Sequence, residues 1–286
     1  MTSSDMAAIW PGTLLIGYLA ITSGILLVGR ERVSGLALGA HFAVLASTCA
    51  VTWLRAVPAW LRAWAPLLLL LFLYSEMPAI IAAAGHATLR DTHVIAWEAA
   101  IFNSQPASTW ARVWPSLIFS ESIHLAYLLY YPIIFVVPAI LYAQRRRVDF
   151  GAAVGILMTT FVLCFFCYAA FPVAGPRYLW ESTAPDGPFR LLALFLLESG
   201  SSQGTAFPSS HVAVATTQSV LAIAMLGRPG LLIAGISAGL AAGAIYGGFH
   251  YAIDVVAGLG LGGVVATVGL VLTRSTRAQA KAIAPT

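Results

Sequence analysis

Charge is scarce in this sequence of 286 residues. Asp, Glu, Lys and Arg together make up 9% of it, whereas 59% of the residues are hydrophobic. Soluble domains carry about 25% charged residues, and no stretch of this chain resembles one. The scarcity therefore excludes a soluble globular protein. Together with a mean hydropathy of +0.86, it indicates a polytopic membrane protein.

Cysteine is also rare: the chain has three, Cys49, Cys164 and Cys167, and each lies in an apolar run. Cys164 and Cys167 form a C-x-x-C pair, but a structural zinc site requires four ligands. We therefore interpret all three as ordinary side chains of membrane helices.

Two further signals are missing. The first ten residues lack the basic region of a cleaved signal peptide, so the first apolar span is predicted to be retained. The net charge of +4 does not indicate nucleic-acid binding, because the basic residues sit in short loops between apolar stretches rather than on one face. We therefore expect no nucleic acid as a partner.

Long apolar runs are what the chain does have. A helix that spans a bilayer needs about 20 mostly apolar residues. The sequence predicts an all-α, polytopic integral membrane bundle of about eight transmembrane helices. The expected spans cover residues 12–29, 35–54, 66–84, 121–142, 150–171, 209–226, 230–247 and 250–272.

The stretch 85–120 differs from the rest, because it mixes charged residues and prolines with tryptophans. We predict an interfacial segment with short amphipathic helices, of which residues 95–102 form the clearest. Three tryptophans in this stretch suit the headgroup level of a membrane. They are Trp97, Trp110 and Trp114.

Lysine and arginine placement predicts the orientation. If the arginines at 145–147 are cytoplasmic, alternation of eight spans puts most other basic residues on the same side and most acidic residues on the opposite side. Both termini are then cytoplasmic, and Arg177, His211 and His250 share the non-cytoplasmic face. The other basic residues on the cytoplasmic side are Arg55, Arg62, Arg228, Arg274, Arg277 and Lys281.

His250 and Asp254 are four residues apart, so on a helix they share one face. A carboxylate beside an imidazole fixes its tautomer and raises its basicity, which prepares the other ring nitrogen as a nucleophile or base. Two other interpretations stay open at this point: a buried polar pair that stabilises helix packing, and a pair of metal ligands.

Pro208, Ser209, Ser210 and His211 stand where a helix is predicted to begin. Free backbone N–H groups at a helix start form an anion site, and His211 lies beside it. Arg177 follows a span on the same face and can hold phosphate through its planar fork. Taken alone, the Pro208–His211 motif can be a simple helix cap, and Arg177 can be an anchor at the lipid headgroups. Their occurrence together on one face favours phosphate chemistry.

The order Arg177, then Pro-Ser-x-His ending at His211, then His250-x-x-x-Asp254 resembles the type 2 phosphatidic acid phosphatase superfamily over about residues 120–272. The resemblance implies a six-helix phosphatase-like core and a metal-independent enzyme with no cofactor that acts through a phosphohistidine. In it, His250 is the nucleophile, Asp254 orients it, and His211 protonates the leaving group. Three residues would bind the phosphoryl oxygens: Arg177, Ser209 and Ser210.

Two cations of the superfamily pattern are missing, because Ala170 and Ala244 stand at their positions, and Tyr178 replaces a proline. A site with fewer cations favours a phosphodiester over a phosphate monoester.

The closing motif HYAIDV (250–255) is similar to the inositol phosphorylceramide and sphingomyelin synthases, which move a headgroup between lipids. Alternatively, Arg112 or Arg190 restores the charge, and the enzyme is a lipid phosphate monoester phosphatase.

Glu121 and His124 are predicted to begin the fourth span on the same face. They could bind the acceptor or a polar headgroup, or form an interfacial cap. By domain, we expect N-terminal transmembrane helices at 1–65, a catalytic membrane domain at 66–272 and a short cytoplasmic tail at 273–286.

Two non-enzymatic functions are alternatives to this interpretation. A proton-coupled transporter would use His250 and Asp254 as a relay, but transporters place such groups near mid-membrane within inverted repeats, whereas here the polar groups cluster at one face. A non-enzymatic lipid-binding protein would be expected to lack one of the catalytic side chains, and all are present.

Overall fold

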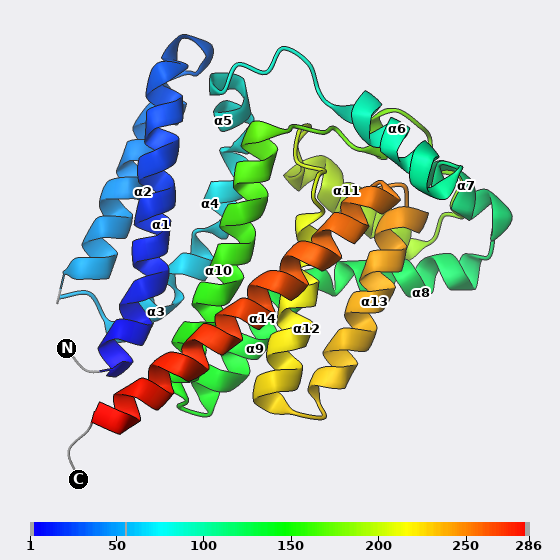
Figure 1. Ribbon diagram of the computed structural model, residues 1–286. Helices are drawn as coiled ribbons and strands as arrows, with labels where there is room; N and C mark the ends of the chain where they lie inside the picture. The colour runs from blue at the N-terminus through cyan, green and yellow to red at the C-terminus, as the bar shows by residue number, and fades with distance from the viewer. Residues whose placement is uncertain (1–2, 55, 284–286) are drawn as a thin grey trace.

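The computed structural model describes residues 3–54 and 56–283 (Figure 1). Within these residues every regular element is a helix, and one isolated bridge, between Val173 and Thr205, is the only β pairing. The predicted class, an all-α polytopic membrane bundle, is confirmed. Of the basic residues used to predict orientation, Arg55 and the side chains of Arg277 and Lys281 lie outside the described part.

Each predicted span coincides with a helix or a bent helix pair. Four helices of the described chain are long and apolar enough to cross a membrane: α1 (Ser3–Val28), α2 (Gly35–Trp53), α10 (Arg147–Ala170) and α14 (Ala252–Ile283). Two more spans are bent pairs, and α12 (Ser210–Leu226) and α13 (Gly230–Tyr246) are apolar helices of 17 residues each.

The first bent span comprises α3 (Ala59–Leu68), α4 (Leu70–Ser75) and α5 (Met77–Ala83), with a bend of 53° before α5. The second comprises α8 (Leu117–Leu128) and α9 (Tyr130–Ala143), bent by 44°. Pro78 and Pro132 lie in the first turn after each break. Proline cannot donate the hydrogen bond that would continue the preceding helix, which explains both positions.

Several boundaries differ from the predicted ones. α8 begins at Leu117 rather than near 121, because the Ser116 hydroxyl caps it by accepting a hydrogen bond from the backbone N–H of Phe119 (3.3 Å). α14 continues past residue 272 to Ile283, since the sequence there is rich in alanine and other good helix formers. Glu121 and His124 are therefore interior residues of α8 and not its start.

The predicted interfacial segment contains α6 (Asp91–Phe102) and α7 (Pro106–Val113). α6 is inverted relative to a helix of a soluble protein: its buried face carries Asp91, Val94 and Glu98, whereas Trp97 and Ile101 are exposed. The helix therefore presents carboxylates to the protein and apolar side chains outward.

α10, α12 and α14 pack together in the centre of the bundle. Glycine on α14 permits the close approach of α12: a Cβ atom at Gly258 would lie 2.6 Å from the Ser209 carbonyl oxygen, and Gly262 is crowded in the same way by Ala213. Small residues four apart are the usual means of close helix packing in membranes. This contact brings the beginnings of α12 and α14 together.

α1 begins and α14 ends at the same end of the bundle as the turns between α9 and α10 and between α12 and α13, whereas α6 and α7 lie across the other end (Figure 1). That arrangement agrees with the predicted even number of spans. Which side is cytoplasmic stays a prediction.

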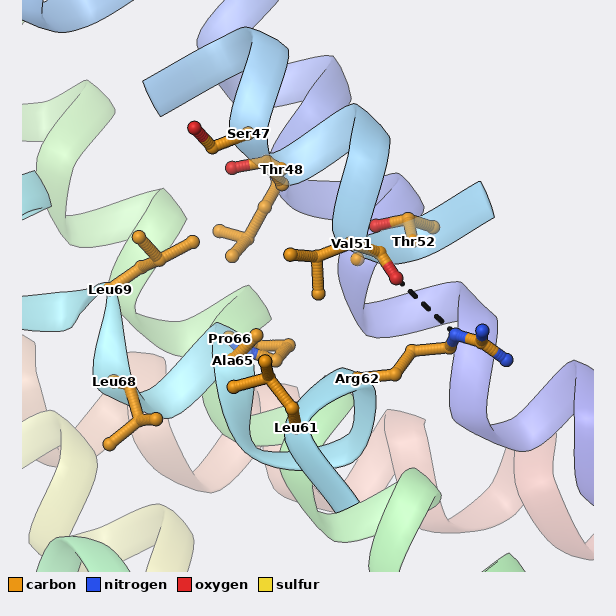
Figure 2. Close-up of a pocket in the computed structure, with 12 residues that line it drawn as sticks. Ser47, Thr48, Val51, Thr52, Leu61, Arg62, Ala65, Pro66, Leu68 and Leu69 are labelled. Carbon is orange, nitrogen blue, oxygen red and sulfur yellow. Dashed lines mark hydrogen bonds between the residues drawn. The ribbon is translucent and has the colours of Figure 1, made fainter. Parts of the chain in front are cut away.

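A separate cavity of about 200 Å³ lies between α1, α2 and α3 (Figure 2). Its walls are mostly apolar, and Arg62 at its edge donates a hydrogen bond from Nε to the Val51 carbonyl (3.3 Å). Among the residues that line it there is no histidine, aspartate or glutamate. The catalytic candidates are elsewhere.

Candidate active site

Three loops meet at the end of the bundle where α10 ends and α14 begins. The first follows α10 and contains the 3-10 helix η2 (Pro176–Tyr178); the second precedes α12; the third joins α13 to α14. Val173 of the first loop donates its N–H to the Gly204 carbonyl (3.4 Å), and Ala206 donates to the Val173 carbonyl (3.0 Å). Ser209 donates to the Asp254 carbonyl (3.0 Å), which ties the second loop to α14.

His250 and Asp254 lie close together, as their spacing predicted, but they do not share a helix: α14 begins at Ala252, so His250 lies in the loop before it and Asp254 in its first turn. His250 Nδ1 lies 3.1 Å from the Ala206 carbonyl oxygen and 3.5 Å from Asp254 Oδ2. A carbonyl oxygen only accepts hydrogen bonds, so Nδ1 carries the proton and Nε2 is left with its lone pair. Asp254 is fully buried, and its Oδ2 accepts a hydrogen bond from the Tyr251 N–H (2.9 Å). The imidazole is thus held in the tautomer that a nucleophile requires.

His211 lies in the first turn of α12, with its ring centroid 5.8 Å from that of His250. Tyr130 and Tyr127 pack against the ring, with centroids 4.2 Å and 5.3 Å away. His211 Nδ1 is buried and has no hydrogen-bond partner among the described residues. Buried polar atoms are nearly always paired, so this nitrogen marks a position where a further group is expected.

The candidate catalytic histidines meet at one small cavity of about 20 Å³. Arg177, His211 and His250 all line it. Arg177 donates from Nη2 to the Ser201 hydroxyl (3.0 Å) and to the Tyr178 hydroxyl, and its guanidinium lies 4.4 Å from the centre of the Tyr178 ring. Tyr178, the departure from the superfamily pattern, therefore helps to hold the cation in place.

Ser209 and Ser210 do not line the cavity in the described structure. Both are buried, and the Ser209 hydroxyl caps α12 by accepting a hydrogen bond from the Val212 N–H (3.4 Å). The Ser210 N–H donates to the Tyr168 hydroxyl (3.2 Å). Their roles here are in shaping the start of α12, so any phosphate contact from them remains a prediction.

Glu121 and His124 are also away from the cavity lining. Glu121 caps the start of α11 (Pro188–Gly200), because its carboxylate accepts hydrogen bonds from the N–H groups of Phe189 (2.8 Å) and Arg190 (3.1 Å). His124 is fully buried, with Nδ1 2.6 Å from the Ser120 carbonyl. This geometry favours the capping interpretation of Glu121 over an acceptor site.

Neither of the two candidate replacement cations lines the cavity. Arg190 is buried and its guanidinium is paired with Asp186. Arg112 is exposed on α7. Within the described residues, Arg177 is therefore the one arginine or lysine at the cavity wall.

Sequence reasoning missed two tyrosines of this wall. Tyr74, from α4, lines the cavity and shares a hydrogen bond with the Thr205 hydroxyl (2.9 Å), and Tyr127 comes from α8. Neither belongs to a recognisable motif. Each lies just before the bend of a broken span, a feature that hydropathy does not predict.

Sequence reasoning also missed the role of Glu98. This residue is fully buried, and its Oε1 accepts hydrogen bonds from the N–H groups of Ala252 and of Ile253 (3.2 Å), at the start of α14. Burial, reinforced by the negative charge of Asp254, raises the pKa of Glu98 to about 6. The i, i+7 spacing of Asp91 and Glu98 on one helix was the available signal.

The raised pKa of Glu98 predicts a pH-dependent stability. The unfolded chain releases this proton near its ordinary pKa of 4.5, while the folded protein holds it up to about 6. Between these values the folded state binds more protons, so the free energy of unfolding falls as pH rises, by on the order of 2 kcal/mol in total. Glu98→Gln keeps an oxygen that can accept the hydrogen bonds from the start of α14, but its amide does not titrate.

We therefore expect the melting temperature of the wild type in detergent to decline relative to Glu98→Gln between pH 4 and 7. Thermal melts at several pH values measure the difference. Parallel curves for the two proteins would contradict a raised pKa at Glu98.

Comparison with known proteins agrees with this geometry. Residues 92–268 match the family model of the PAP2 superfamily. The match spans more than half of the chain, so the protein belongs to this superfamily, whose general chemistry is that of phosphatases and phosphotransferases of lipid phosphates. Searches of curated proteins and of solved structures return no match. The matched range begins earlier than the 120 expected and takes in α6 and α7.

Proposed function

We propose that the protein is a lipid phosphotransferase, which moves a phospho-headgroup from a phospholipid to a lipid alcohol through a phosphohistidine at His250. The observation that carries the proposal is a cavity lined by two histidines and a single cation, Arg177. We place this site on the non-cytoplasmic side, on the basis of the distribution of arginine and lysine. The similarity of the HYAIDV motif to the sphingolipid synthases supports transfer over hydrolysis.

In the first step, Nε2 of His250 attacks phosphorus and the bond from phosphorus to the lipid oxygen breaks. Asp254 and the Ala206 carbonyl hold Nδ1, so that the ring accepts the phosphoryl group at Nε2 alone. His211 donates a proton to the departing alkoxide. Arg177 neutralises charge on the phosphoryl oxygens.

In the second step, the proton returns to His211 from the hydroxyl of the acceptor. The acceptor oxygen attacks phosphorus, the N–P bond breaks, and His250 regains its lone pair. Water in place of the lipid alcohol would complete a hydrolysis by the same bond changes. The outcome is therefore determined by which hydroxyl reaches His211.

Arg177 alone is a weak match for a phosphate monoester, which carries nearly two negative charges at neutral pH. A phosphodiester carries one. Ala244, where the superfamily pattern has a cation, is fully buried, and its carbonyl accepts hydrogen bonds from the N–H groups of Phe249 and His250 (both 3.0 Å). No arginine or lysine of the described residues other than Arg177 lines the cavity in place of the missing cation, which supports a diester substrate.

An apolar groove of about 410 Å³ beside the catalytic loops supports a lipid substrate. Its walls come from α6, α14 and Phe207, and their residues include Trp97, Ile101 and Val256. Phe207 directly follows Ala206, whose carbonyl holds His250. An acyl chain in this groove would lie next to the headgroup site.

We assign the catalytic domain to residues 66–272, flanked by N-terminal helices at 1–65 and a tail at 273–286. The family match alone begins at residue 92. Tyr74 nevertheless lines the catalytic cavity, which supports including the bent span that contains it.

The experiment that tests the function is incubation of the purified protein with a labelled phospholipid and a mixture of lipid alcohols, followed by mass spectrometry of the products. Label in a new phosphodiester lipid is the expected result. Label found only in free headgroup phosphate would make the protein a hydrolase. No release of label from any phospholipid would overturn both forms.

We also expect turnover to persist in the presence of a chelator. His250, His211 and Arg177 can supply the nucleophile, the proton and the charge neutralisation that a metal supplies in other phosphotransferases. Product formation should change less than about twofold after dialysis against EDTA. Loss of activity with recovery on addition of zinc or magnesium would contradict this prediction.

A further inference from the structure

Asp91, at the start of α6, contacts two of the three catalytic loops at once. Its Oδ2 accepts a hydrogen bond from the Ala174 N–H (2.9 Å), and its Oδ1 accepts one from the Gly175 N–H (3.0 Å). Oδ1 also accepts a hydrogen bond from the Tyr251 hydroxyl (2.9 Å). The residue is 8% exposed, so these bonds are shielded from water.

The bonded groups are next to the reacting ones. Ala174 lines the catalytic cavity, and Gly175, which has a φ of 100°, leads into the turn that carries Arg177. Tyr251 directly follows His250. One carboxylate therefore bonds both the loop of the phosphate-binding cation and the loop of the nucleophile.

Only a carboxylate suits this position. Asp91 accepts three hydrogen bonds through two oxygens, and its charge strengthens each of them. Asparagine has the same shape, but one oxygen becomes an NH₂ group that cannot accept a bond from a backbone N–H. Replacement by asparagine would thus release at least one of the two loops.

We infer that Asp91 is a positioning residue that fixes the separation between Arg177 and His250. The inference rests on the proposed function, because it assigns those two side chains to the same phosphoryl group. Phosphorus must come within reach of Nε2 of His250 while its oxygens are held by Arg177. A misplacement of about 1 Å can reduce a rate about 100-fold.

This role predicts a specific kinetic pattern for Asp91→Asn. The value of kcat should fall about 100-fold, while KM, which depends mainly on the lipid chains, should change little. Tyr251→Phe removes one of the three bonds and should lower kcat by a smaller factor, about tenfold. Asp91→Glu retains the charge but is one carbon longer, so it should not restore the rate.

The inhibition constants of two phosphate analogues distinguish a positioning role of Asp91 from a general loss of structure. Orthovanadate forms a five-coordinate adduct that must engage His250 and Arg177 together, whereas inorganic phosphate can bind through Arg177 alone. In Asp91→Asn, the inhibition constant for orthovanadate should rise by about the same factor as kcat falls. The inhibition constant for phosphate should change far less.

The matched control is Asp149→Asn. Asp149 pairs with Arg146 (2.8 Å) at the opposite end of α10 from the site, so this variant loses an aspartate charge without touching the catalytic loops. It should retain wild-type kcat and orthovanadate inhibition. If Asp91→Asn does not fold, Tyr251→Phe, which removes only a hydroxyl, provides the same test.

Wild-type kcat and orthovanadate inhibition in both Asp91→Asn and Tyr251→Phe would overturn the inference. So would a loss that affects phosphate and orthovanadate equally and follows the melting temperature, because Asp91 would then act only in folding. A wild-type protein with neither turnover nor orthovanadate inhibition would instead overturn the proposed function. The two failures are therefore distinguishable.

Discussion

Replacing His250 with alanine is expected to abolish turnover and any covalent phosphoprotein. The loss should be on the order of 10⁴-fold or more, because the intermediate cannot form without the imidazole. The Ala206 carbonyl and Asp254 hold the His250 ring, whereas Nδ1 of His211, the other histidine of the cavity wall, has no hydrogen-bond partner among the described residues, so we do not expect His211 to take over as nucleophile. Rapid quenching in alkali after reaction with a phosphate-labelled lipid, followed by gel separation, measures the labelled protein.

Asp254→Asn extends this prediction. The variant should still fold, because the oxygen that accepts the Tyr251 N–H can be retained, but it loses the charge that stabilises the His250 ring. Its rate should fall strongly while its melting temperature changes little. The matched control for His250→Ala is His93→Ala, since His93 is exposed and does not line the cavity. A His250→Ala protein with normal turnover would refute the assigned nucleophile.

The fold was largely predictable because hydropathy reports directly on burial in a bilayer. All eight apolar stretches became helices or bent pairs. Hydropathy could not predict which face of each helix is buried. α6 was expected to be amphipathic at the interface, yet it buries Asp91 and Glu98 and exposes Ile101. The buried face of α6 meets backbone N–H groups of the loops that line the site, which explains its carboxylates, and the sequence of α6 alone does not show which face meets those loops.

The site was predictable where local geometry fixes it. The four-residue spacing of His250 and Asp254 predicted a pair, and His250 Nδ1 lies 3.5 Å from Asp254 Oδ2, although His250 precedes α14 and is not part of it. The positions of Ser209, Glu121 and His124 could not be predicted in the same way. Whether a hydroxyl or carboxylate faces a cavity or caps a helix depends on neighbours far away in sequence, such as α11 for Glu121.

The second large effect expected is a preference for diester over monoester lipids. A charge-assisted hydrogen bond contributes on the order of 1.5–3 kcal/mol, and two cations of the superfamily pattern are absent. At 1.4 kcal/mol per tenfold, a dianionic monoester should be bound more weakly by about two to four powers of ten. A monoanionic diester has less charge to neutralise. Turnover on a phosphatidyl-headgroup lipid and on phosphatidic acid, compared under identical conditions, measures the preference.

Restoring a cation should shift the preference toward monoesters. Ala244→Arg is unsuitable, because Ala244 is fully buried, whereas Ala174 lines the catalytic cavity beside Arg177. We therefore expect Ala174→Arg to raise turnover on phosphatidic acid relative to the diester, while Ala174→Gln, which adds bulk without charge, should not. If the wild type already hydrolyses phosphatidic acid faster than any diester, headgroup transfer is wrong. The protein is then a lipid phosphatase for which one cavity arginine is sufficient.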